Sequence, residues 1–244
     1  MQNSTLSDVS RETWLLQFAV SWQQGEHIAI IGPTGTGKTT IAQLLLEIRD
    51  FCCVLAIKRI DETLERFKNG PKFGMSRYTI IQKWPPEYNQ HRVVFWKKPK
   101  SLAPAELKRQ SAVMGSALNQ MYLSGGWCIF FDDTGYIVSQ LGLAHELATM
   151  LSQGRSAGIS VVVAMVRPRS MVARVPKEAL NQCSHVIVFQ FTDLQEVSAC
   201  ADIVGISKGD MIQLIRTLDR HEFLAFSQGK VVKVRNELPL EGKE

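Results

Sequence analysis

Short apolar runs alternate with amphipathic stretches along most of the chain. Several apolar runs are continuous, as in ISVVVAM, which is typical of strands that are covered on both faces. We predict strands at 27–32, 52–57, 78–82, 92–96, 127–132, 159–165 and 185–190. The spacing of apolar residues predicts helices over 38–49, 103–124, 137–153 and 193–204. Strands and helices in alternation predict an α/β fold with a mostly parallel central sheet and helices on both faces.

The two ends of the chain depart from this alternation. Residues 1–25 carry Trp14, Phe18 and Trp22 and are apolar enough to pack against the core. The stretch EFLAFSQGKVVKVRNEL reads as two strands joined at Gln228-Gly229, so we predict a C-terminal β-hairpin that borders the sheet or packs on a neighbouring subunit. Without repeats or long linkers, we expect one domain over 1–244. It would consist of an N-terminal extension (1–25), a nucleotide-binding core (26–205) and a C-terminal helix and hairpin (206–244).

The composition is that of a globular protein with a moderate positive charge. Of the 244 residues, 45% are hydrophobic, enough for a buried core. The net charge of +5 is compatible with a nucleic-acid partner but does not demonstrate one. The five cysteines form no C-x-x-C pair, which predicts buried, reduced thiols. No apolar run approaches the ~20 residues of a membrane helix and no signal-peptide core is present, so we expect a cytoplasmic protein, or a virion-associated one if it is viral.

The stretch IAIIGPTGTGKTTIAQLL carries a complete phosphate-binding motif. It matches G-x-x-x-x-G-K-[ST] between a predicted strand and a predicted helix, the context that a P-loop requires. Glycines let backbone N–H groups curl around phosphates, and the helix N-terminus adds favourable partial charge. Lys38 can reach the β- and γ-phosphates, and Thr39 can hold Mg²⁺ through its hydroxyl. We therefore predict binding of ATP and Mg²⁺, with nucleotide contacts from Gly32, Pro33, Thr34, Gly35, Thr36, Gly37, Lys38, Thr39 and Thr40.

Two carboxylates, Asp132 and Asp133, follow the later strand WCIFFDD. A buried parallel strand delivers its last side chains to the carboxyl edge of the sheet, where ligands bind in this fold class. Asp132 would then lie near the metal held by Thr39, and Asp133 would face the γ-phosphate and polarise a water. The alternative is an ordinary acidic turn. At least two predicted strands separate the loop strand from the acid strand, which favours an extra strand between them, the plan of ATP-hydrolysing motors rather than small kinases.

The block LSQGRSAGISVVVAMVRPRSMVARVPKEALNQCSHVIVFQFTD, residues 151–193, resembles the corresponding block of the HerA/FtsK superfamily of DNA-pumping ATPases. With the phosphate loop and the acid strand, the resemblance covers roughly residues 26–230 and is greatest to the minimal genome-packaging ATPases of membrane-containing viruses. It implies a RecA-like P-loop NTPase core, ATP hydrolysis, a homo-oligomeric ring and double-stranded DNA as the substrate. It also implies a viral portal or capsid vertex protein as a partner.

Three features depart from the superfamily's pattern. The acid pair is Asp-Asp where relatives usually have Asp-Glu, so Asp133 is one methylene shorter. Relatives often carry a glutamine before the Arg-Pro pair as a sensor of the γ-phosphate, whereas this chain has Val166, which has no hydrogen-bonding side chain. We also expect no N-terminal barrel or membrane helices of the kind that many relatives carry. Which residue takes the sensor's place stays open.

The resemblance also gives roles to basic residues. In a ring each site lies at a subunit boundary, so Arg155 is expected to act as an arginine finger on the neighbour's ATP. The alternative is a solvated arginine at a helix end. The segment RPRSMVARVPK contains no acid, and its cations would grip DNA phosphates without reading sequence, or else form an ordinary exposed loop. The candidate DNA contacts are Arg167, Arg169, Arg174 and Lys177.

These residues together predict a double-stranded DNA translocase, with a role in viral genome packaging, whose catalytic residues are Lys38, Asp133 and Arg155. Two other functions remain open. An ATP-dependent regulatory or adaptor switch would suit the slow hydrolysis that Val166 and the short Asp133 suggest. A small-molecule kinase is disfavoured by the order of the predicted strands and by the lack of an obvious arginine-rich lid.

Overall fold

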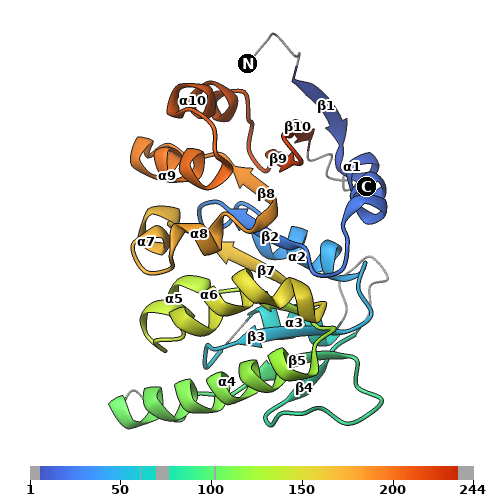
Figure 1. The fold of residues 1–244 in the computed structure, drawn as a ribbon, viewed down its shortest axis with the longest axis vertical. Coiled ribbons are helices and arrows are strands. Elements are labelled where there is room, and N and C mark those ends of the chain that lie inside the picture. The colour runs from blue at the N-terminus through green and yellow to red at the C-terminus, as the bar shows by residue number, and fades with distance from the viewer. Residues whose placement is uncertain (1–5, 61, 70–76, 102, 236–244) are drawn as a thin grey trace, which may run out of the picture.

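The computed structural model describes residues 6–60, 62–69, 77–101 and 103–235, and their strands form one sheet (Figure 1). The strands are β1 (Ser7–Ser10), β2 (His27–Ile31), β3 (Cys52–Ala56), β4 (Thr79–Ile81), β5 (Arg92–Trp96), β6 (Cys128–Phe131), β7 (Ser160–Met165), β8 (Cys183–Phe189), β9 (Phe223–Ser227) and β10 (Lys230–Arg235). Their order is β1-β10-β9-β8-β2-β7-β6-β3-β5-β4. The seven strands from β8 to β4 are all parallel, as predicted.

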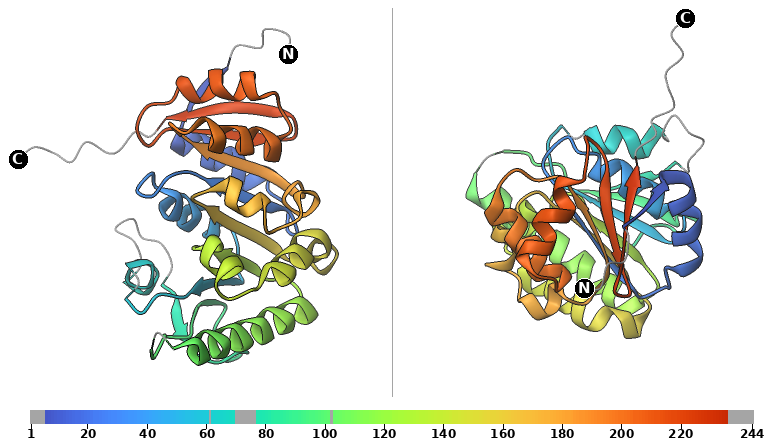
Figure 2. Two further views of the ribbon diagram at one scale, coloured as in Figure 1. Left: turned by 90° about the vertical axis from the view of Figure 1, so that its left-hand side faces the viewer. Right: turned by 90° about the horizontal axis from the view of Figure 1, so that it is seen from above.

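Helices cover both faces of this sheet, as the continuous apolar strands predict (Figure 2). One face packs against α1 (Arg11–Ser21), α2 (Lys38–Leu46) and α3 (Glu62–Asn69). The other packs against α4 (Pro104–Ser124), α5 (Thr134–Ser139), α6 (Ala144–Gln153), α7 (Pro168–Val172), α8 (Lys177–Leu180), α9 (Leu194–Val204) and α10 (Lys208–Arg216). A short 3-10 helix, η1 (Gly154–Ala157), joins α6 to β7.

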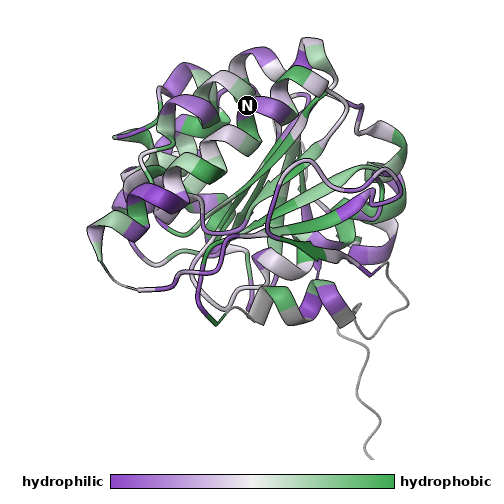
Figure 3. Ribbon diagram, turned by 90° about the horizontal axis from the view of Figure 1, so that it is seen from below, coloured by the Kyte–Doolittle hydropathy of each residue, from purple (hydrophilic) through white to green (hydrophobic). Residues whose placement is uncertain are grey.

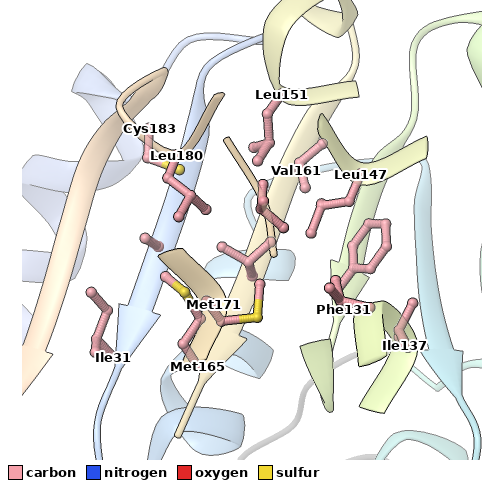
Figure 4. Close-up of a cluster of buried hydrophobic side chains, with 14 of the residues drawn as sticks. Ile31, Phe131, Ile137, Leu147, Leu151, Val161, Met165, Met171, Leu180 and Cys183 are labelled. Atoms are coloured by element: carbon pink, nitrogen blue, oxygen red, sulfur yellow. The ribbon is translucent and has the colours of Figure 1, made fainter. Parts of the chain in front are cut away.

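The side chains of each strand alternate between two hydrophobic cores. In β2, Ala29 and Ile31 face the core under α4 to α10, whereas Ile28 and Ile30 face the core under α1 to α3. Hydrophobic residues gather on the strands and polar ones on the surrounding helices (Figure 3). Figure 4 shows part of the first core, where Phe131 is fully buried. Burying a side chain of this size contributes roughly 1.5–3 kcal/mol to stability, so the two cores stabilise the sheet whose strand ends carry the site.

The predicted C-terminal hairpin is present and borders the sheet. Strands β9 and β10 are antiparallel and join at Gln228-Gly229, and β9 pairs with β8. Strand β1 adds to the outer side of β10 in parallel, so the two ends of the described chain meet at one edge (Figure 2). The expected packing of the N-terminal segment is also confirmed, because Trp14, Phe18 and Trp22 are buried.

Two expected helices differ from those found. The helix expected over 137–153 is in fact two helices: α5 ends at Ser139, and α6 begins at Ala144. The helix expected over 38–49 ends at Leu46. In the first case Leu141 and Leu143 are buried in the intervening turn, so the apolar spacing runs on through a break in the backbone.

The extra strand expected between the loop strand and the acid strand is present. Strand β7 lies between β2, which leads into the phosphate loop, and β6, which ends at the acids. It does not come from the intervening sequence, because β3, β4 and β5 lie on the far side of β6. The arrangement goes against the simple kinase alternative.

The five cysteines are buried and unpaired, as predicted. None of the helices that the structure describes has the length and hydrophobicity needed to cross a bilayer.

Candidate functional site

The phosphate loop is an open cradle at the carboxyl end of β2. Gly35 and Gly37 have φ angles of +82° and +103°, and no atom lies within 4 Å of where a Cβ would stand on either residue. Gly37 caps α2 without a side-chain hydrogen bond. The first backbone N–H groups of a helix have no hydrogen-bond partner within the helix. In α2 these groups start at Lys38, next to the open space beside Gly35 and Gly37. An anionic group fits such a cradle.

Lys38 is drawn across the loop. Its Nζ donates to the carbonyl oxygens of Gly32 and Pro33, each at 2.8 Å. Burial lowers the pKa of Lys38 to about 8, although the carboxylates of Asp132 and Asp133 oppose the shift. The ammonium therefore lies within electrostatic reach of both acids, at the base of the cradle.

The structure brings together Thr39 and Asp132, the two residues expected near the metal. The Thr39 hydroxyl donates to Asp132 Oδ1 at 2.9 Å, although the two residues lie on α2 and directly after β6. A hydroxyl and a carboxylate oxygen beside a phosphate cradle are the hard oxygen ligands that Mg²⁺ prefers. The residues present thus fit a magnesium ion that would bridge the loop and the acid strand.

Asp133 makes two contacts that the sequence did not reveal. Its Oδ1 accepts a hydrogen bond from the backbone N–H of Tyr136 at 3.3 Å and so caps α5. Its Oδ2 lies 3.5 Å from Nζ of Lys58, which follows β3 by two residues. The only sequence signal for Lys58 is its position, since it is a cation directly after a buried strand at the ligand-binding edge.

A cleft of about 720 Å³ lies over these residues. Its wall holds the predicted loop residues Thr34 to Thr40 and both acids. Val166 lies on the rim, 41% exposed, and offers only an aliphatic surface. Sequence reasoning missed four polar lining residues, which are Arg11, Lys58, Arg66 and His221. Of these, His221 has its ring Nδ1 3.3 Å from the carbonyl oxygen of Thr36.

Arg155 lies at the opposite edge of the sheet from the cleft. It belongs to η1, just before β7, and its Nη2 is 3.8 Å from Oε1 of Glu26, which directly precedes β2. The phosphate loop follows the other end of β2, and a five-residue strand spans about 17 Å. The exposed Arg155 side chain is therefore not brought together with the phosphate loop of its own chain.

Glu26 anchors that edge. Its Oε2 accepts from the backbone N–H of Gln23 at 2.9 Å and lies 3.0 Å from Nε2 of His185. Burial raises the pKa of Glu26, but the hydrogen bonds from Gln23 and His185 and the charge of Arg155 outweigh it, so the pKa is lowered. Burial lowers the pKa of His185, which favours a neutral ring.

The four candidate DNA contacts are all exposed. Arg167 directly follows the cleft residue Val166. Two others are engaged with α9: the Arg169 guanidinium donates to Gln195, and Nζ of Lys177 lies 3.6 Å from Asp202. Arg174 is exposed in the turn between α7 and α8. The four residues follow the chain from the end of β7 to the start of β8.

Solved structures with the same fold exist, but no protein-family model and no curated protein matches the sequence. The chain is similar to the genome packaging NTPase B204 from Sulfolobus turreted icosahedral virus 2 in complex with AMPPCP, with 12% identity, a TM-score of 0.60, and 88% of this chain and 100% of that chain covered. It is also similar to VirB4 of Thermoanaerobacter pseudethanolicus, with 10% identity, a TM-score of 0.60 and coverage of 87% and 89%. The cytoplasmic domain of the Thermomonospora curvata Type VII secretion ATPase EccC matches at 14% identity and a TM-score of 0.51, over 86% of this chain and 25% of that one. The resemblance read from the sequence is thus confirmed at the level of the fold, which this chain shares with a viral genome packaging NTPase and a secretion ATPase.

Proposed function

We propose that the chain is a Mg²⁺-dependent ATPase. The observation that carries the proposal is the 2.9 Å hydrogen bond from Thr39 to Asp132 beneath an open phosphate loop, which joins two motifs 93 residues apart. Lys38 would leave the loop carbonyls to contact the β- and γ-phosphates, and Asp133 would orient the attacking water. Thr39 and Asp132 would hold the magnesium ion, which neutralises charge between the phosphates.

We further propose that hydrolysis drives movement of double-stranded DNA, as in packaging of a viral genome. The fold shared with a protein described as a genome packaging NTPase supports this, as do the net charge of +5 and the exposed basic residues between β7 and β8. Arg167, Arg169, Arg174 and Lys177 would contact DNA phosphates, with a strong dependence on salt. A portal or capsid vertex protein would be the partner that receives the motor.

We propose that several copies assemble and that Arg155 acts on the nucleotide of a neighbouring subunit. Arg155 is exposed at the amino edge of the sheet and β2 separates it from its own loop, so the proposed role requires a neighbour. A closed homo-oligomeric ring supplies such a neighbour to every subunit. An arginine from the neighbour would stabilise charge that develops on the γ-phosphate.

The test is ATP hydrolysis by the purified chain, with and without double-stranded DNA, beside the Lys38→Ala variant. We expect Mg²⁺-dependent phosphate release that DNA stimulates, that rising salt suppresses and that Lys38→Ala abolishes. Negative-stain images with ATP and DNA should show rings. Hydrolysis that ignores DNA at every salt concentration would contradict the motor while leaving the ATPase intact.

The contacts of Asp133 favour one alternative, an ATP-dependent regulatory or adaptor switch. Both carboxylate oxygens are engaged, one by the backbone of α5 and one by Lys58, which suits slow turnover. A switch of this kind would bind ATP tightly, hydrolyse it slowly and show no response to DNA, so the same assay separates the two functions.

A further inference from the structure

Lys58 lines the cleft beside Asp133, so its ammonium could pair either with that carboxylate or with a nucleotide bound in the cleft. Its Nζ lies 3.5 Å from Oδ2 of Asp133, both residues line the cleft, and their side chains are 55% and 36% exposed to solvent. The start of the Lys58 side chain is fixed, because Nε1 of Trp96 donates to the Lys58 carbonyl oxygen at 2.9 Å. The flexible four-carbon stem beyond that point is free to swing its ammonium.

The other cations of the cleft are placed differently. Lys38 is bound to carbonyl oxygens of the phosphate loop. Arg66 donates to the Thr40 hydroxyl at 3.4 Å, on the helix that leaves the loop. Lys58 differs from both, because it is paired with the second acid of the cleft, Asp133.

Asp133 cannot serve an attacking water well while it is held in this way. One oxygen accepts a hydrogen bond at the N-terminus of α5, and the other is paired with the ammonium of Lys58 at 3.5 Å. A triphosphate adds several negative charges to the same cleft, and its terminal phosphate is a stronger anion than a carboxylate that already has a helix N–H as partner. A diphosphate ends one phosphate short and lacks this attraction.

We propose that Lys58 is a positioning residue that responds to the γ-phosphate: it pairs with Asp133 when no triphosphate is present and moves to the γ-phosphate when ATP binds, which frees Asp133 to orient water. The inference rests on the proposed ATPase function and deepens it. It gives this chain a γ-phosphate contact in a cleft whose rim residue Val166 has no hydrogen-bonding side chain. The opposing interpretation is a surface ion pair with a small effect on stability and no role in binding.

The test compares two affinities rather than activity. Fluorescence titrations with Mg²⁺ measure the Kd for ADP and for the β,γ-imido analogue of ATP in the wild type and in Lys58→Ala. We expect the triphosphate analogue to bind about 10- to 100-fold more weakly to the variant, the loss that follows removal of one hydrogen bond to a charged group, and the Kd for ADP to change less than about twofold. Lys58→Arg, which keeps the charge, should restore most of the preference for triphosphate.

Arg59→Ala is the matched control, since Arg59 is the next residue, equally cationic and exposed, and does not line the cleft. It should leave both Kd values unchanged. Asp133→Asn should keep the triphosphate preference, because Lys58 remains to contact the γ-phosphate. Thermal denaturation confirms that each variant is folded.

Equal weakening of both nucleotides by Lys58→Ala, or no weakening of either, would overturn the inference. Loss of the triphosphate preference in Arg59→Ala would overturn it too, because the effect would then be general electrostatics. If the wild type binds neither nucleotide, the proposed ATPase function fails instead, so the two failures are distinguishable.

Discussion

Two adjacent glycines, Gly125 and Gly126, allow a test of the packing of the turn before β6 against η1, the 3-10 helix that carries Arg155. They connect α4 to β6, and their φ angles are +67° and +76°. A Cβ on Gly125 would stand 2.4 Å from the carbonyl oxygen of Ala157, in the 3-10 helix η1 that also carries Arg155, whereas a Cβ on Gly126 would meet no atom within 4 Å. The same substitution at these neighbouring positions therefore differs in one steric contact, although both residues have a positive φ.

The size of the difference follows from these geometries. Gly125 has φ +67° and ψ −179°, a region that only glycine occupies readily, so Gly125→Ala costs roughly 1–3 kcal/mol of backbone strain. Relief of the contact with a backbone carbonyl adds about 1–3 kcal/mol, as in overpacked cores. Gly126→Ala pays about 1–2 kcal/mol for its positive φ alone. Gly125→Ala should thus be the more destabilising by about 2 kcal/mol, which is roughly 4–8 °C in Tm for a chain of this size.

The assay is urea denaturation followed by tryptophan fluorescence, with Tm values from circular dichroism as a second measure. We expect the urea midpoint to fall for both variants and to fall further for Gly125→Ala. Equal midpoints would refute the reasoning, because they would mean that the turn relaxes away from the Ala157 carbonyl at no cost. A larger loss for Gly126→Ala would refute it as well.

Three further predictions concern charged groups. Glu26→Gln should lower the free energy of unfolding by about 1–3 kcal/mol at pH 7, since it removes the charge from a buried acceptor of two hydrogen bonds. The folded-state pKa of Glu26 is lowered, so this stabilisation is complete above the unfolded pKa of about 4.3 and is lost as the pH falls through the folded pKa. The urea midpoints of variant and wild type should therefore converge below about pH 4. A difference in midpoint that stays constant with pH would contradict a stabilising role for the ionised Glu26. Asp133→Asn should keep the α5 cap, since asparagine caps a helix as well as aspartate, and it should still bind nucleotide. Its rate of phosphate release should fall about 10²- to 10⁴-fold. A near-normal rate would exclude Asp133 as the water-orienting group. Mixing Arg155→Ala with Lys38→Ala subunits should recover some hydrolysis if Arg155 acts on a neighbour, and no recovery at any ratio would argue against that role.

Much of the fold and of the nucleotide site could be read from local sequence. Strands such as β2, β3, β6 and β7 were predictable because each is a short apolar run that is buried on both faces. Strand β1, with the sequence SDVS, has no such run and was not predicted. Thr39 and Asp132 were expected at the same edge of the sheet. Thr39 ends the phosphate-loop motif that follows β2, Asp132 directly follows β6, and the carboxyl ends of parallel strands share one edge. A motif of this kind places a residue through its own backbone, with no need to know the neighbours.

What the sequence could not show depends on pairings between distant segments. Lys58 meets Asp133 only because β3 lies beside β6, an order that no local pattern encodes. Arg169 contacts α9, a distant segment, through Gln195. The run of basic residues in the sequence gave no sign that one of its cations is engaged in this way. The break between α5 and α6 was hidden because the buried Leu141 continues the helical spacing of apolar residues across it.

The pairing of β1 with β10 has a consequence for how the chain folds. It sets Ser7 opposite Val232, so the first described strand depends on the last for its register. Such a contact carries a high loop-closure entropy, and β1 cannot dock before the hairpin exists. Until then the outer side of β10 is an open edge with unpaired backbone groups, the kind of edge to which a strand from another chain can add. Strand β1 covers this edge and becomes the outer strand in its place, but it has only four residues, and a very short edge strand offers few unpaired backbone groups to another chain.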